Sequence, residues 1–159
     1  MPQMPKILLV CTGNLCRSPM AEALLKARLA RDEARQDWQV ESAGTWAEDG
    51  RPATGYAIKE MAQRGIDLRA HRSRGVTRRM MEEADVVLVM TRRHAEALGA
   101  AFPEQIHKVY QLSEMVERTY DVNDPYGGTR LEYAYIAREL EQLIEEGYER
   151  IVALVEEAR

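Results

Sequence analysis

The chain has 159 residues, of which 45% are hydrophobic and 30% are charged. This size and balance argue against a disordered chain and predict one globular domain over residues 1–159. The formal net charge of -4 argues against general nucleic-acid binding, and no apolar run approaches the roughly 20 residues that span a membrane. The short apolar run near the N-terminus is not followed by a signal-peptide cleavage site, so we expect a cytoplasmic protein without membrane or nucleic-acid partners.

The first predicted elements are a strand, a loop and a helix. Lys6–Val10 ends in the continuous apolar run Ile-Leu-Leu-Val, which is typical of a parallel strand covered on both faces. The loop Cys11–Arg17 follows this strand. A helix then begins near Ser18, with Ser18 as its N-cap and Pro19 at its first helical position.

The rest of the chain alternates between strands and helices. In chain order we predict a strand at 38–43, a helix at 54–64, a short helix at 77–84, a strand at 86–90, a helix at 91–98, a strand at 107–112 and a long helix after residue 128. Thr129 and Glu132 form a capping box for the last helix, in which Gly147 predicts a bend or break. The alternation predicts an open, mostly parallel α/β sheet with helices on both faces and ligands beyond the carboxyl ends of the strands.

The segment Cys11–Ser18, Cys-Thr-Gly-Asn-Leu-Cys-Arg-Ser, carries the strongest functional signal. Successive N–H groups of such a loop can curl around an anion, and the positive end of the following helix adds to the attraction. Gly13 is expected to permit a backbone turn that a side chain would obstruct. We therefore predict a phosphate-binding loop after the first strand, formed by Cys11, Thr12, Gly13, Asn14, Leu15, Cys16, Arg17 and Ser18.

Three side chains of this loop have predicted chemical roles. Electropositive surroundings favour the thiolate form of Cys11, which could then attack phosphorus. The planar fork of Arg17 can bind two phosphate oxygens at once and stabilise their charge during phosphoryl transfer. The hydroxyl of Ser18 can donate to the thiolate when a phosphocysteine is broken down. A buried, inert cysteine is the alternative for Cys11, but the preceding strand, the glycine, the Arg-Ser-Pro run and the helix together favour a nucleophile.

Asp124 is the candidate proton donor for the leaving group. It lies in the predicted loop 120–128, where Pro125 restricts the backbone beside it. Asp-Pro is also common in turns, and from these residues alone a turn is the more frequent explanation. A contact between Asp124 and Cys11 is therefore a hypothesis at this point.

The cysteines and histidines form no metal-binding pattern. Cys11 and Cys16 lack the close spacing of paired metal ligands. The three histidines, His71, His94 and His107, form no paired ligand motif either. We expect neither a metal nor a cofactor.

At these residues the chain resembles the low-molecular-weight protein tyrosine phosphatases, including their protein arginine phosphatase subgroup. The matching segments are Cys11–Pro19 with the following Met-Ala-Glu-Ala, Ser42-Ala43-Gly44, the region of His71, Ala84-Asp85 before an apolar strand, and Asp124-Pro125-Tyr126. They span nearly the whole chain in the family's order. Their combination is specific, although each motif alone is not.

The resemblance implies a four-stranded parallel sheet flanked by helices and a metal-free, two-step reaction. Cys11 would take the phosphoryl group while Asp124 protonates the leaving atom, and Asp124 would then activate water to hydrolyse the phosphocysteine. The resemblance also implies a set of hydrogen-bonded residues that hold the loop open: Asn14, Ser18, Ser42 and His71.

By the same resemblance, Tyr126 and Trp46 would form aromatic walls for a substrate ring. The loop of Trp46 is a residue shorter than the family's usual one, so a core or surface role for Trp46 is an equal alternative. Cys16 lies close enough in sequence to Cys11 to trap it as a disulfide after oxidation, which would protect the nucleophile. We expect a monomer whose partner is a phosphorylated protein.

We predict a phosphatase that acts on phosphotyrosine, and a protein arginine phosphatase is the main alternative. Asp124–Gly128 resembles the Asp-Pro-aromatic-Gly-Gly of arginine phosphatases, but Leu15 stands where that subgroup has a threonine and resembles the tyrosine-specific type. Arsenate reduction would need additional cysteines to relay a disulfide, and the chain has two cysteines. A non-catalytic phosphate-binding module would not need the nucleophile, the arginine and the acid together.

Overall fold

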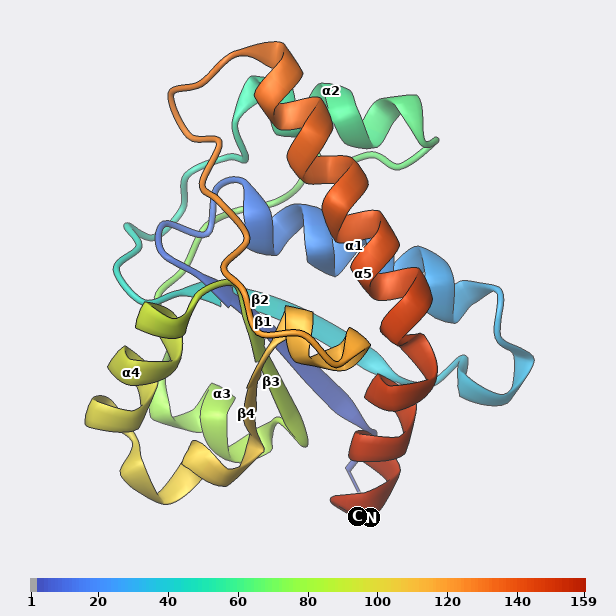
Figure 1. The fold of residues 1–159 in the computed structure, drawn as a ribbon, viewed down its shortest axis with the longest axis vertical. Coiled ribbons are helices and arrows are strands. Elements are labelled where there is room, and N and C mark those ends of the chain that lie inside the picture. Colours follow the sequence, from blue (N-terminus) through green and yellow to red (C-terminus); the bar gives the residue numbers. More distant parts are fainter. Residues whose placement is uncertain (1–2) are drawn as a thin grey trace.

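The computed structural model describes residues 3–159 and contains a four-stranded, all-parallel sheet with the strand order β2-β1-β3-β4 (Figure 1). The strands are β1 Lys6–Cys11, β2 Gln39–Gly44, β3 Val86–Val89 and β4 Val109–Gln111. The helices are α1 Arg17–Ala30, α2 Gly55–Gln63, α3 Arg78–Glu83, α4 Arg92–Ala101 and α5 Arg130–Glu157, with 3-10 helices η1 Glu33–Arg35, η2 Pro103–Lys108 and η3 Leu112–Val116. No helix in the described range is long and apolar enough to cross a membrane.

Strand β1 is covered by helices on both of its faces. Successive side chains of a strand point to opposite sides, so Ile7 and Leu9 pack in the core formed with α1, α2 and α5. Leu8 and Val10 pack in a second core with residues of α3 and α4. Figure 1 shows these two groups of helices on opposite sides of the sheet. The predicted fold class, with helices on both faces of a parallel sheet, is confirmed.

The strand order places a switch point between β1 and β3. The chain leaves β1 for β2 on one side and later enters β3 on the other side, so the carboxyl ends of β1 and β3 lie next to each other. Cys11 ends β1, and α4 begins directly after β3. Ligands of open α/β sheets bind in the crevice at such a point. The Val122 N–H donates to the carbonyl of Met90 at 2.9 Å, which brings the segment before α5 to the same edge.

Helix α1 begins at Arg17, two residues before the predicted first helical position, Pro19. Cys16 is its N-cap residue and makes no side-chain capping bond, so the prediction of Ser18 as N-cap is wrong. Ser18 and Pro19 lie in the first turn instead. The physical reason is that the Ser18 hydroxyl contacts Asn14 and Cys11 rather than a backbone N–H of the helix.

Two boundaries near β4 also differ from the prediction. The predicted strand at 107–112 is reduced to Val109–Gln111, because η2 includes His107 and Lys108 and η3 begins at Leu112. Helix α4 continues to Ala101, past the predicted end at residue 98.

Helix α5 is continuous over 28 residues, so the predicted bend or break at Gly147 is wrong. Gly147 serves close packing instead, since a Cβ there would lie 2.6 Å from the Cβ of Met115 in η3. At the start of α5, Thr129 Oγ1 accepts the Glu132 N–H at 3.2 Å, which is one half of the predicted capping box. The Glu132 carboxylate lies against Gly128, where a Cβ would be 2.0 Å from its oxygen.

We expect Gly147→Ala to destabilise the protein although alanine is the better helix former. The gain in helix propensity is about 1 kcal/mol, whereas the clash with Met115 forces η3 away from α5 at a cost of about 1–3 kcal/mol. Gly55→Ala is the control, because a Cβ at Gly55 meets no atom of the described residues 3–159 within 4 Å. Chemical denaturation measures both, and a Gly147→Ala variant as stable as Gly55→Ala would contradict the packing explanation.

Candidate active site

The backbone of the loop after β1 is oriented to bind an anion. The carbonyl oxygens of Cys11, Thr12 and Leu15 accept hydrogen bonds from the N–H groups of Thr45, Trp46 and Thr54, at 2.9–3.1 Å. In a trans peptide the C=O of one residue and the N–H of the next point in opposite directions. The N–H groups that follow these three carbonyls therefore point away from the neighbouring segments and toward the inside of the loop, which forms an anion-binding nest.

Asn14, and not Gly13, carries the unusual backbone geometry of the loop. Asn14 has a φ of 58°, in the left-handed region that asparagine tolerates better than most residues. A Cβ at Gly13 would meet only Leu15, at 3.8 Å, which is an ordinary contact. The prediction that a side chain at Gly13 would obstruct the turn is wrong for this conformation.

The Asn14 side chain connects the loop to β2. Its Nδ2 donates to Ser18 Oγ at 2.8 Å and to Ser42 Oγ at 3.0 Å, and all three residues are buried. Ser18 Oγ also lies 2.9 Å from Cys11 Sγ. Since Ser18 accepts from Asn14, its own proton is available to donate to the sulfur of Cys11.

Residues outside the loop continue this network. His71 Nε2 contacts the Asn14 carbonyl at 2.8 Å, as the resemblance implied, and the Arg74 N–H donates to Asn14 Oδ1 at 3.1 Å. Ser42 donates to the carboxylate of Glu22 at 2.5 Å. The contacts of Arg74 and Glu22 were not predicted, because a backbone N–H has no sequence signature and Glu22 fits an ordinary helix surface.

Arg17 holds a nearly buried positive charge below the loop, with 4% of its surface exposed. Its Nη1 donates to the Val122 carbonyl at 2.8 Å, and its Nη2 lies 3.5 Å from Asp124 Oδ2. Within residues 3–159 the Nε–H has no hydrogen-bond partner. A buried donor without an acceptor is costly, so an oxyanion in the loop would relieve a deficit that the free protein carries.

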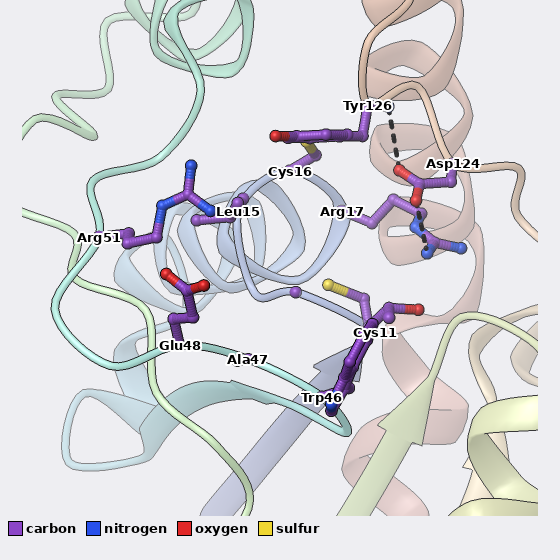
Figure 2. Close-up of a pocket in the computed structure, with 12 residues that line it drawn as sticks. Cys11, Leu15, Cys16, Arg17, Trp46, Ala47, Glu48, Arg51, Asp124 and Tyr126 are labelled. Carbon is purple, nitrogen blue, oxygen red and sulfur yellow. Dashed lines mark hydrogen bonds and ion pairs between the residues drawn. The ribbon is translucent and has the colours of Figure 1, made fainter.

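Asp124 lies at the mouth of the same site despite its distance in sequence. Besides its contact with Arg17, it accepts the Tyr126 N–H through Oδ1 at 3.0 Å (Figure 2). This second bond orients the carboxylate across the turn at Pro125. About half of the side chain is exposed, so Asp124 can meet both a bound group and water.

The site opens into a cavity of about 470 Å³, and Cys11, Leu15 and Asp124 are among the residues that line it. Figure 2 shows Trp46 and Tyr126 on opposite sides of the cavity, with Cys11 between them. Trp46 is 87% exposed and Tyr126 57%, so both aromatic residues are accessible to a ligand in the cavity. The charged residues Glu48 and Arg51 also line the cavity and were not predicted, because exposed charges in a loop resemble an ordinary solvated surface.

Cys16 points away from the solvent. Its Sγ lies 3.2 Å from the Tyr133 hydroxyl and 3.5 Å from Thr54 Oγ1. Burial raises the pKa of the Cys16 thiol, as do the nearby charges of Asp124 and Cys11, whereas the two hydroxyl contacts lower it. Both cysteines are free thiols in this structure. The described residues contain no group of three or more His, Cys, Asp or Glu side chains that could hold a metal ion.

His94 contacts the loop from α4, and its role was not predicted. Its Nε2 lies 2.8 Å from Thr12 Oγ1, and its ring is 4% exposed. Burial, with a smaller contribution from the positive charge of Arg17, lowers the pKa of His94 from 6.5 to about 4. His94 is therefore neutral near pH 7.

We expect this buried histidine to make stability depend on pH. The unfolded chain binds a proton at His94 below about pH 6.5 and the folded chain only below about pH 4, so the stabilising effect is complete above pH 6.5 and is lost as the pH falls toward 4. The loss amounts to about 3 kcal/mol. His94→Asn should flatten the measured pH profile of the free energy of unfolding over this range. Replacement of the exposed His107 by Gln is the control, and equal profiles for both variants would contradict the prediction.

The comparisons with known proteins agree with this geometry. The sequence model of the family described as low molecular weight phosphotyrosine protein phosphatase matches residues 6–157. The chain is 40% identical over 139 residues to the protein-arginine-phosphatase of Bacillus subtilis (strain 168), covering 87% of this chain and 91% of that protein. It is 41% identical over 120 residues to the probable low molecular weight protein-tyrosine-phosphatase EpsP of Ralstonia solanacearum, covering 76% and 77%.

The fold is likewise similar to solved structures of such proteins. One of them is the YwlE arginine phosphatase, in a cysteine-to-serine mutant whose active-site serine is phosphorylated. The TM-score is 0.87 at 37% sequence identity, and the match covers 92% of this chain and 95% of that one. By its sequence and its fold, the chain belongs to the low-molecular-weight phosphotyrosine protein phosphatase family.

Proposed function

We propose that the protein hydrolyses phosphotyrosine in phosphorylated proteins, with Cys11 as nucleophile, Arg17 as phosphate-binding residue and Asp124 as general acid and base. The observation that carries this proposal is the buried Arg17 guanidinium, whose Nε–H has no partner within residues 3–159. It lies beside the loop that contains Cys11 and contacts the carboxylate of Asp124. Nucleophile, anion-binding donor and proton donor therefore line one cavity.

In the first step, Cys11 Sγ attacks phosphorus and forms the S–P bond while the bond from phosphorus to the phenolic oxygen breaks. Protonated Asp124 gives its proton to that oxygen, and the loop N–H groups and Arg17 bind the phosphoryl oxygens. In the second step, Asp124 takes a proton from water, the water oxygen attacks phosphorus and the S–P bond breaks. The Ser18 hydroxyl, 2.9 Å from the sulfur, stabilises the departing thiolate.

The walls of the cavity support an aromatic substrate. Leu15 from the loop, Trp46 from the segment after β2 and Tyr126 from the segment before α5 all line it. Aromatic and branched apolar side chains pack well against a phenyl ring, and aromatic pairs gain about 0.5–1.5 kcal/mol beyond simple burial. A guanidinium leaving group would bring additional N–H donors into contact with Leu15, which has no acceptor for them.

Phosphoarginine is the second candidate, because relatives at 37–40% identity are named arginine phosphatases. The Gly127-Gly128 pair, which resembles that group, has an explanation in the backbone itself. Gly127 has a φ of 77°, and a Cβ at Gly128 would lie 2.8 Å from the backbone carbonyl oxygen of Pro125. The two glycines are therefore required by the turn before α5 and give little support to either substrate.

We expect Cys11→Ser and Arg17→Ala each to remove almost all turnover of an aryl phosphate such as p-nitrophenyl phosphate. The serine hydroxyl is a far weaker nucleophile than a thiolate, and alanine removes the buried guanidinium that binds phosphate. Circular dichroism and a thermal melt show whether each variant is folded. A folded Cys11→Ser variant with wild-type turnover would contradict the covalent mechanism, and with it the enzymatic function at this site.

Asp124→Asn should slow substrates with poor leaving groups far more than activated ones. Only a poor leaving group needs full protonation, so the loss should be on the order of 10²–10⁴-fold for phenyl phosphate and much smaller for a dinitrophenyl phosphate. The measurement is kcat/KM across a series of aryl phosphates of increasing phenol pKa. The same loss for every member of the series would remove Asp124 from the role of general acid.

Leu15→Thr should lower kcat/KM for a phosphotyrosine peptide and raise it, relative to wild type, for a phosphoarginine peptide. Threonine gives up apolar contact with a phenyl ring and provides a hydroxyl for an otherwise unpaired guanidinium donor, which is worth about 1–3 kcal/mol. The ratio of the two values should shift by roughly tenfold or more, since 1.4 kcal/mol is tenfold in rate. Leu15→Ile is the control that keeps the apolar wall. A wild type that already prefers phosphoarginine would contradict the phosphotyrosine proposal.

A further inference from the structure

We propose that His94 is a positioning residue for the phosphate-binding loop: it fixes Thr12, and through Thr12 it fixes the loop N–H groups and the segment that carries Trp46. The inference rests on the proposed function, because the loop is taken to bind the phosphoryl group. It assigns a role in that site to a residue of α4, which does not itself line the cavity.

The hydrogen bonds of His94 determine which ring nitrogen carries the proton. Nδ1 lies 3.1 Å from the Thr91 N–H, which can only donate, so Nδ1 is the acceptor. In the neutral ring the proton is then on Nε2, which donates to Thr12 Oγ1 at 2.8 Å. The ring thus forms a rigid, directional link between the start of α4 and the second residue of the loop.

The hydrogen bond from His94 Nε2 to Thr12 is not needed to cap the N-terminus of α4. The Thr91 hydroxyl accepts the His94 N–H at 3.2 Å, and His94 Nδ1 accepts the Thr91 N–H, so the capping box is complete without Nε2. A short acceptor side chain at position 94 would serve the same cap. The donor at Nε2 is the part of histidine that reaches Thr12, 82 positions away in the sequence.

Thr12 lies where three segments meet. Its backbone follows β1, its hydroxyl accepts from α4, and its carbonyl accepts the Trp46 N–H at 3.0 Å. The end of β2 approaches it so closely that a Cβ at Gly44 would lie 2.3 Å from the Thr12 oxygen. A shift of Thr12 would therefore move the start of the nest and the backbone of Trp46 together.

The charge state of His94 suits this role. A cationic ring would need a proton on Nδ1, which faces the Thr91 N–H, and would bring two donors together. Arg17 opposes a second cation at this place, whereas Asp121 and Asp124 favour one, and burial is the largest effect against it. His94 therefore holds the loop as a neutral donor and leaves phosphate binding to Arg17.

Two pairs of variants separate the link from the cap. His94→Asn keeps an acceptor near the position of Nδ1 and cannot reach Thr12, whereas His94→Gln has the length to reach it. Thr12→Val removes the hydroxyl that accepts from His94 and leaves the capping box of α4 unchanged. Thr12→Ser is the matched variant that keeps a hydroxyl at this position. The readouts are kcat and KM for p-nitrophenyl phosphate and the dissociation constant for inorganic phosphate measured by NMR titration. The exposed His107→Gln is the control and should behave as wild type.

We expect His94→Asn and Thr12→Val each to lower kcat/KM by roughly 10- to 100-fold and to weaken phosphate binding, because loop donors displaced by a fraction of an ångström lose alignment. The double variant should be little worse than either single one, since both remove the same link. Thr12→Ser should recover most of the loss seen in Thr12→Val. The thermal midpoint of Thr12→Val should fall, because the buried Nε2–H of His94 loses its acceptor. Both kcat/KM and phosphate affinity are therefore measured well below that midpoint, where a purely structural loss of stability would leave them unchanged.

Wild-type kinetics and phosphate affinity in Thr12→Val would overturn the inference, even if His94→Asn failed to fold. Additive losses in the double variant would also overturn it, because His94 would then act independently of Thr12. Phosphate affinity is measured without turnover, so it tests the link even if the proposed reaction is wrong. The proposed function has its own test in Cys11→Ser, and the two failures are therefore distinguishable.

Discussion

The buried guanidinium of Arg17 is the constraint on which the site depends. A charge with 4% of its surface exposed is costly unless it is paired, and among residues 3–159 its partners are the Val122 carbonyl and, at 3.5 Å, the half-exposed carboxylate of Asp124. Within residues 3–159 its Nε–H is left without an acceptor. Next to this guanidinium lie the loop after β1, whose N–H groups are oriented inward, and the start of α1, which adds positive potential. A phosphate group would satisfy the donors that the fold leaves incomplete.

Holding such a loop open requires contacts from several parts of the chain. The Asn14 side chain connects the loop to β2 through Ser42, His71 contacts the Asn14 carbonyl, and His94 contacts Thr12 from α4. These groups are buried or half-buried, and neutral donors such as the amide of Asn14 add no charge that would compete with Arg17. Preorganisation of this kind spares the reaction the cost of orienting donors during the chemical step.

The glycines show why some predictions from the local sequence were wrong. Gly13 and Gly147 were interpreted as residues that free the backbone, yet Gly13 has no positive φ and α5 runs without a break through Gly147. At Gly147 the absence of a Cβ matters because Met115 packs there, and at Gly128 because the backbone carbonyl of Pro125 lies close. A missing side chain can serve either conformation or close approach, and the residue type alone does not distinguish them. Ser18 was misassigned as N-cap because a serine before a proline fits that role, whereas its hydroxyl contacts Asn14 and Cys11 instead of a backbone N–H of the helix.

The fold class could be predicted from the sequence, because the continuous apolar run of β1 and the alternation of strand and helix periods depend on near neighbours in the chain. The sequence also indicated the phosphate-binding loop, whose nucleophile and arginine lie within seven consecutive residues, Cys11–Arg17. The sequence did not indicate that Asp124 reaches Arg17, that His94 reaches Thr12, or that Glu48 and Arg51 line the cavity. Those contacts join residues far apart in the chain. They depend on the strand order and on how each helix packs against the sheet, which no local pattern of residues encodes.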